Sequence, residues 1–210
     1  MAQEALATAR QKLPPLHIDI ARCLIVLAGI LREQGNTAAA KPLIEEATAI
    51  QRQRLGDQHR ELAWGRINFA KILHDEGHLA DAEAVYRESL TMMRATLPQE
   101  HPAIAHSLRA IGRVLIDSGN EAEAQGLLRE ALDIQRVALG DEHPETAITQ
   151  SLLGSCLIEL KQYDEAESLL VAARGTFRRV LTAEHRRTRA AEHALADLRA
   201  ARESLTSLGE

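Results

Sequence analysis

The sequence repeats itself with a period of 42 residues, and this spacing constrains the fold more than any other feature. Each repeat opens on a leucine that is followed four residues later by a histidine, and the repeats align without gaps. These pairs are Leu13 and His17, Leu55 and His59, Leu97 and His101, Leu139 and His143, and Leu181 and His185. A fixed period of this length is typical of proteins that stack one supersecondary unit many times. It predicts four full repeats, at 13–54, 55–96, 97–138 and 139–180.

Two helical segments are expected in each repeat. Leu24, Leu27, Ala28 and Leu31 lie at helical spacing in the first segment of the first repeat, and a second apolar series follows Gly35-Asn36. Glycine permits the left-handed backbone that ends a helix, and asparagine can cap the next helix. Equivalent breaks fall at Gly77 and at Gly119-Asn120, while Pro102 and Pro144 suit the first residue of a helix. Each repeat is therefore predicted to be a helical hairpin.

The composition favours helices over sheets. Aromatic residues make up only 2% of the 210 residues, whereas hydrophobic residues make up 45%. The core must therefore be built from Leu, Ile, Val and Ala, which suit closely packed helices better than a β-sandwich. We expect an all-α fold, a right-handed α-solenoid of helix-turn-helix repeats.

Partial repeats are expected at both ends of the sequence. Residues 1–12 align with the second half of a repeat, so they form either an N-terminal capping helix or a half-repeat cut from a longer array. Residues 181–210 combine an apolar face with several arginines. This segment is expected to be a C-terminal capping helix, which repeat proteins use to cover their last hairpin.

The small residues of the repeat carry a resemblance to a known family. Ala28, Ala70, Gly112 and Gly154 share one position of the first helix, and an alanine follows each of them twelve residues later. With the linker Leu139-Gly-Asp-Glu-His-Pro144, this pattern resembles the tetratricopeptide repeat in its 42-residue, kinesin light chain-like form. The resemblance covers residues 13–180 and implies a protein-interaction scaffold whose first helices line a concave groove.

Neither catalysis nor metal binding is expected. The repeated histidines lie one per repeat, in a stack whose neighbouring helices are about 8–10 Å apart, whereas zinc binds its ligands at about 2 Å. The segment His74-Asp75-Glu76-Gly77-His78 crosses a turn and lacks a second ligand pair at helical spacing. The sequence contains no Gly-rich phosphate loop, no nucleophile elbow and no Cys-x-x-Cys motif. We therefore predict no catalytic residues, no cofactor and no metal.

Charge and hydropathy limit the partners and the compartment. The longest apolar run, 23–31, is shorter than the roughly 20 residues that span a membrane, and residues 1–5 do not resemble a signal peptide. Cys23 and Cys156 are isolated thiols, which fits a reducing compartment. We therefore expect a cytoplasmic protein without a membrane partner. Nucleic acid is not an expected partner, because the net charge of −5 opposes phosphate binding despite the basic segment 171–210.

The first helices define the expected binding groove. Its sixteen positions hold five Lys or Arg residues and no acidic residue, and they include Trp64. Arginine and tryptophan often anchor interfaces, so we expect a protein or peptide partner with acidic and apolar side chains. Three alternatives stay open: Trp64 packs between hairpins, the groove receives another segment of the parent protein, or the chain associates with itself. The expected groove residues are Arg22, Ile25, Arg32, Trp64, Ile67, Asn68, Lys71, His74, His106, Arg109, Arg113, Ile116, Ile148, Ser151, Ser155 and Ile158.

Overall fold

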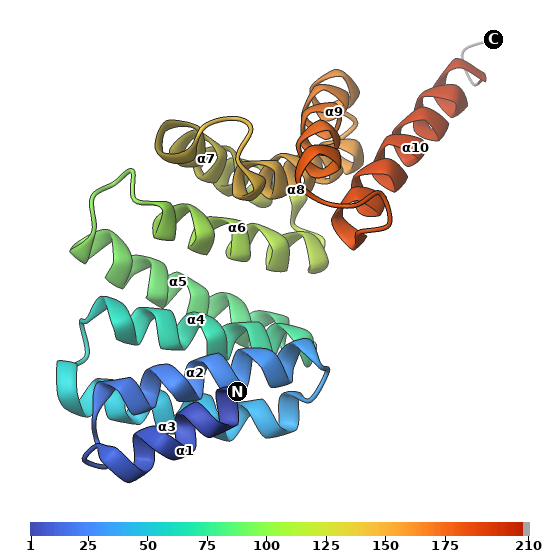
Figure 1. Cartoon of the computed structure of the whole chain (residues 1–210). Coiled ribbons are helices and arrows are strands. Elements are labelled where there is room, and N and C mark those ends of the chain that lie inside the picture. Colours follow the sequence, from blue (N-terminus) through green and yellow to red (C-terminus); the bar gives the residue numbers. More distant parts are fainter. Residues whose placement is uncertain (208–210) are drawn as a thin grey trace. The chain divides into compact units, whose positions relative to one another are not determined.

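The computed structural model describes residues 1–207, in which it contains ten α-helices and no β-strand (Figure 1). The helices are α1 (Ala2–Lys12), α2 (Ile18–Glu33), α3 (Thr37–Leu55), α4 (Arg60–Asp75), α5 (Leu79–Thr96), α6 (Pro102–Asp117), α7 (Glu121–Leu139), α8 (Pro144–Glu159), α9 (Tyr163–Val180) and α10 (Arg186–Ser207). The predicted fold class, an all-α solenoid of helix-turn-helix repeats, is confirmed. The last residues of the expected capping segment, 208–210, lie outside the described residues. No described helix is both long enough and apolar enough to cross a membrane.

The chain forms two compact units. Unit 1 comprises Met1–Pro98 and contains α1 to α5, and unit 2 comprises Gln99–Glu210 and contains α6 to α10. In unit 1, α2 packs against α3 and α4 packs against α5, while α3 also contacts α4. In unit 2, α6 packs against α7 and α8 packs against α9, while α7 also contacts α8 and α9 contacts α10. The hairpins predicted from the sequence are thus the packing elements of both units.

Helices end at the predicted glycine breaks. Gly35, Gly77 and Gly119 have φ angles of 77°, 82° and 79°, in the left-handed region that glycine adopts without steric cost. At the equivalent place in the fourth repeat, Lys161 has a φ of 59°. The N–H of Lys161 donates to the carbonyl of Ile158, as the N–H of Gly35 donates to that of Arg32. The same turn therefore forms without glycine, at a steric cost of roughly 1–2 kcal/mol.

Helix starts follow the sequence with one exception. Pro102 and Pro144 are the first residues of α6 and α8, as predicted. The side chain of Asn36 accepts a hydrogen bond from the N–H of Ala39, with the two atoms 3.1 Å apart. Asn120, which was expected to act in the same way, is the N-cap of α7 but makes no side-chain capping bond. Acidic residues in the first turn of α7 provide the negative charge that favours a helix N-terminus.

Small residues let the two helices of a hairpin approach closely. In unit 1, Ala28, Ala40 and Ile44 pack together in one buried cluster. In unit 2, a Cβ atom on Gly154 would lie 2.7 Å from the Leu170 side chain, so only glycine fits there without a shift. Close approach explains how a core with few aromatic residues stays well packed.

Helix α10 covers the last hairpin of unit 2. Ala191 of α10 is buried in one cluster with Ala147 of α8 and with Ala173 and Phe177 of α9. All four residues are at most 1% exposed. The apolar side of the last hairpin is therefore covered by α10.

Candidate functional site

The repeated histidine caps the start of the first helix in every repeat. Its Nδ1 atom accepts a hydrogen bond from the backbone N–H two residues later, at 3.1 to 3.2 Å. The five capping residues are His17, His59, His101, His143 and His185. Each bond satisfies a donor that the helix itself cannot pair. Within the described part of the chain, no group of three or more His, Cys, Asp or Glu residues could hold a metal ion.

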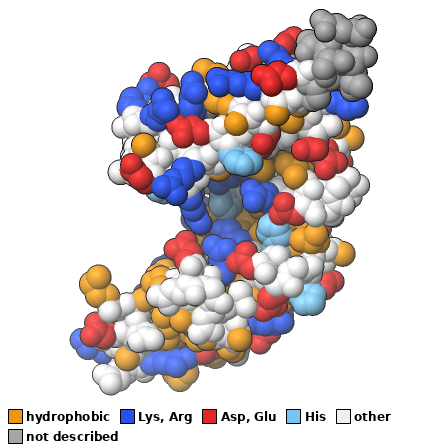
Figure 2. All heavy atoms as spheres, turned by 90° about the vertical axis from the view of Figure 1, so that its right-hand side faces the viewer, with side chains coloured by type: hydrophobic (Ala, Val, Ile, Leu, Met, Phe, Trp, Pro, Cys, Tyr) orange, Lys and Arg blue, Asp and Glu red, His pale blue; other side chains and the backbone are white. Residues whose placement is uncertain are grey.

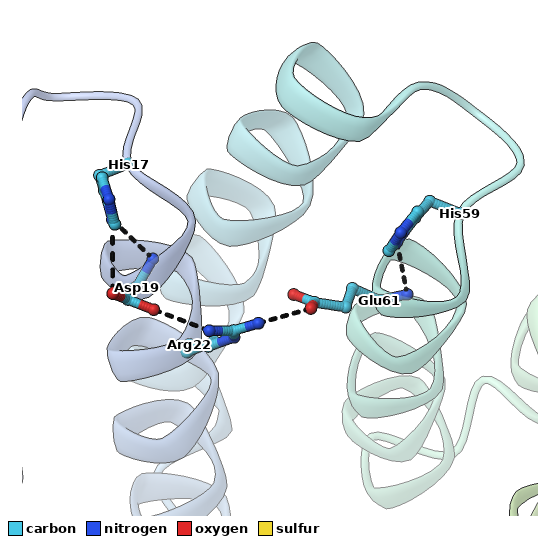
Figure 3. Close-up of polar contacts among 5 residues, drawn as sticks. All are labelled: His17, Asp19, Arg22, His59 and Glu61. Carbon is cyan, nitrogen blue, oxygen red and sulfur yellow. Dashed lines mark hydrogen bonds and ion pairs between the residues drawn. The ribbon is translucent and has the colours of Figure 1, made fainter.

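Arg22 links the first helices of two successive hairpins in unit 1. Its Nη1 atom lies 2.8 Å from Oδ1 of Asp19 in α2, and its Nη2 atom lies 2.6 Å from Oε1 of Glu61 in α4 (Figure 3). The hydrogen bonds with Glu61 and then with Asp19 raise the pKa of Arg22 above its usual value. Both carboxylates lie two residues after a capping histidine, so the helix starts position this contact.

A second arginine makes an equivalent link in unit 2. The Nη2 atom of Arg109 in α6 lies 2.7 Å from Oε2 of Glu145 in α8, and its Nη1 atom lies 3.1 Å from the Glu145 backbone oxygen. Nη2 also lies 3.2 Å from Nδ1 of His106. Partial burial alone would raise the pKa of Glu145, but the charge and hydrogen bonds of Arg109, with smaller effects of His106 and Arg187, lower it below 4.5. Arg109 is only 12% exposed, so this pair is more protected than that of Arg22.

The remaining groove arginines also have acidic partners. Arg32 in α2 lies 2.9 Å from Asp75 at the end of α4, and Arg113 lies 3.3 Å from Asp117 within α6. The excess of cations expected from the groove positions is therefore balanced by carboxylates that lie just outside them. Basic and acidic side chains are interspersed over much of the face drawn in Figure 2.

Trp64 lies at the surface rather than in the core. Its side chain on α4 is 40% exposed, and the ammonium of Lys71 lies 5.8 Å from the centre of its ring. The amide of Asn68 donates a hydrogen bond to the Trp64 backbone oxygen. Ile67, which was expected in the groove, is completely buried. It belongs to the core, where burial of an isoleucine side chain contributes about 1.5–3 kcal/mol.

The other expected groove positions divide between the two units. In unit 1, the positions fall on α2 and α4, which contact each other. In unit 2, they fall on α6 and α8, which also contact each other. Each unit therefore presents its own surface made of two first helices. Those with intermediate burial are Ile25, Arg32, Asn68, Lys71, His74, His106, Arg109, Ile116, Ile148, Ser151, Ser155 and Ile158.

Comparison with protein families gives a clear match. A family model described as tetratricopeptide repeat matches residues 19–95 and 103–174, which is more than half of the chain. A search of the sequence against curated proteins finds no match.

Solved structures with a similar fold include kinesin light chain-like proteins. A Podosopora anserina protein described as a kinesin light chain with nearly identical TPR-like repeats is 26% identical, with a TM-score of 0.74, over 91% of this chain and 90% of that one. BtubC (BKLC) from P. vanneervenii is 17% identical, with a TM-score of 0.74, over 98% of this chain and 89% of that one. A Rap protein in complex with competence and sporulation factor is 18% identical, with a TM-score of 0.67, over 76% of this chain and 43% of that one.

Proposed function

Given that this chain belongs to the tetratricopeptide repeat family, with repeats of the kinesin light chain-like type, we propose that it is a non-catalytic scaffold that binds a peptide or a helical segment of another protein. The fold is that of a protein-interaction scaffold in general. The proposed binding surface in unit 1 consists of the exposed sides of α2 and α4, and that in unit 2 of the exposed sides of α6 and α8.

Exposed Trp64 is the observation that carries this proposal. A tryptophan can bury a large apolar area against a partner, and tryptophan is enriched among the residues that dominate binding energy. Lys71 near its ring provides a positive charge beside the apolar surface. A ligand that places an apolar side chain on Trp64 and a carboxylate near Lys71 would match both features.

The paired arginines define what an acidic ligand must do. Arg22 and Arg109 already bind carboxylates of this chain, so a ligand carboxylate would share or replace Glu61 or Glu145. Such an exchange yields little net energy at exposed positions. The apolar contact at Trp64 should therefore provide most of the affinity, and the charges should select among apolar ligands.

The similar Rap structure supports a peptide or protein partner at the level of the fold. That protein was crystallised with competence and sporulation factor. Sequence identity of 18% extends the likeness to the fold alone. The chemical character of the partner proposed for this chain therefore rests on Trp64, Lys71 and the arginines.

Intrinsic fluorescence offers a direct test, because Trp64 is the single tryptophan of the sequence. Peptides selected against the wild-type protein from a random display library would be titrated while Trp64 emission is recorded. We expect apolar peptides with Asp or Glu to be enriched and to shift the emission. Trp64→Ala should then weaken binding, measured by calorimetry, by about 2 kcal/mol, or about thirtyfold.

Val137→Ala is the matched control, because Val137 is an exposed apolar residue of α7 in unit 2, outside the first helices. It should leave affinity unchanged. Thermal melting of both variants should resemble that of the wild type. The proposal is wrong for this surface if the selected peptides bind Trp64→Ala and wild type equally well.

A further inference from the structure

One face of α2 is apolar and exposed. The side chains of Val26 and Ile30 are 58% and 40% exposed. They lie four residues apart, so they neighbour each other on the same side of the helix. Arg22 precedes them and Glu33 follows them along this side, and both are exposed. We call this surface the α2 face.

The same position is covered in the equivalent helices α4 and α8. The counterparts of Ile30 are Ile72 and Cys156, which are 1% and 0% exposed. Ile72 packs against Ala28, Ala40 and Ile44 of the preceding hairpin. The thiol of Cys156 donates a hydrogen bond to the backbone oxygen of Glu121 in α7, also in the preceding hairpin. A preceding hairpin is thus what buries this position, whereas α2 is preceded only by the single helix α1 within the described residues.

The last helix of unit 2 does not offer a matching apolar surface. Arg189 and Arg199 of α10 occupy the positions that Ala147 and Leu157 hold in α8. Ala147 and Leu157 are fully buried, but Arg189 and Arg199 are exposed. A contact between the α2 face of one molecule and α10 of the next would place these charges against Val26 and Ile30. Burying unpaired charges on apolar side chains is costly, so a head-to-tail chain of molecules is disfavoured.

We propose that the α2 face is covered by the α2 face of a second copy of this chain. Two copies related by a two-fold axis would place their α2 helices antiparallel, with Val26 opposite Ile30 of the second copy. This register brings the Arg22 end of one helix near Glu33 of the other. Apolar side chains then meet at the centre and opposite charges meet at both ends. Because the two contacting surfaces are identical, the assembly closes as a dimer.

This dimer is independent of the peptide-binding function, since the α2 face includes neither Trp64 nor Lys71. The first test is the molar mass of the full chain as a function of concentration, measured by sedimentation equilibrium. We expect a reversible monomer–dimer equilibrium for the wild type. Val26→Lys combined with Ile30→Lys should give a monomer at every concentration at which the wild type is dimeric. Val137→Lys, at an exposed valine in unit 2, should leave the dimer intact.

Charge exchange tests the antiparallel register. Glu33→Arg should weaken the dimer, and Arg22→Glu in the same chain should restore it, because the two charges change places. Cross-linking gives a second test that tolerates some loss of stability. After Cys23→Ala removes the nearby thiol, an equimolar mixture of the Val26→Cys and Ile30→Cys proteins should form a disulfide-linked heterodimer under mild oxidation.

Three results would overturn the dimer. One is a wild-type protein that is monomeric throughout the concentration range, which would leave the face to a helix from another protein. Another is a dimer that survives the paired lysine substitutions. The third is a mixture of cysteine variants that forms no heterodimer although both proteins are folded by circular dichroism.

Discussion

Arg109 and Glu145 belong to successive hairpins, and the guanidinium of Arg109 binds both the carboxylate and the backbone oxygen of Glu145. The two residues are 36 positions apart in the sequence. Glu145 is also the residue whose backbone N–H donates to the capping histidine His143. One residue therefore connects the start of α8 to the preceding first helix, α6.

Glu145→Gln should lower the free energy of unfolding by about 0.5–1 kcal/mol at neutral pH, because a partly exposed ion pair contributes little more. The folded protein lowers the pKa of Glu145 below 4.5. The stabilisation is therefore present above that pH and is lost as the pH falls through the folded-state pKa. Urea denaturation of wild type and variant should show stabilities that converge at acidic pH. Glu100→Gln, at an exposed residue, is the control; a difference that stays constant with pH would contradict the assignment.

His143→Ala should destabilise the protein by about 1 kcal/mol, because the substitution removes the capping bond at the start of α8. His143→Asn should retain part of that stability, since asparagine is a good N-cap. His78 is the N-cap of α5 but makes no side-chain capping bond, so His78→Ala is the matched control and should change stability less. Chemical denaturation would measure all three variants, and equal losses for the two alanine variants would count against a capping role for His143.

Gly154→Ala should destabilise the protein by about 1–3 kcal/mol, because the new methyl group would overlap Leu170 and approach the backbone oxygen of Ala166 at 3.3 Å. Gly126→Ala should instead stabilise it by up to about 1 kcal/mol, since the helical site has no atom within 4 Å of the added Cβ. Melting temperatures of the two variants should therefore move in opposite directions. A shift in the same direction would show that the α8–α9 contact tolerates a larger residue.

Ala191→Asp should cost more than about 3 kcal/mol, because it places a carboxylate in the cluster that α10 forms with Ala147 and Phe177. Ala190→Asp changes the exposed neighbouring residue of the same helix and should have little effect. Thermal unfolding and light scattering should show a less stable, aggregation-prone Ala191→Asp protein, as should deletion of residues 186–210. Similar melting of the two aspartate variants would mean that α10 is dispensable for covering the last hairpin.

Much of the fold could be predicted because the repeat provides several local signals in agreement. Gly35, Gly77 and Gly119 mark the turns, and apolar spacing marks the helices between them. The turn at Lys161 has no glycine, yet it forms because the surrounding hairpins impose it. The repeat boundaries at residues 55, 97 and 139 stay a prediction.

The candidate site was less accessible from the sequence. Counting charges along the groove positions gave five cations without an anion, because Glu61 and Glu145 lie at positions outside that set. Each of them comes next to its arginine only when successive first helices pack together. Three acidic residues, each two positions after a repeated histidine, were the signal that could have revealed the pairing. Ile67 was misplaced for a similar reason, since helical spacing alone does not say how deeply a neighbouring helix covers it.

The arginine bridges between successive helices make the order of the repeats matter. If residues 55–96 were lost in frame during evolution, α2 would be followed by α6, and Ala103 would take the place of Glu61. Arg22 would then keep Asp19 but lose its partner on the next helix. Loss of residues 97–138 would similarly place Ile67 where Arg109 meets Glu145. Gain or loss of whole repeats would therefore require compensating charge changes in the neighbouring repeats, even if every hairpin kept its fold.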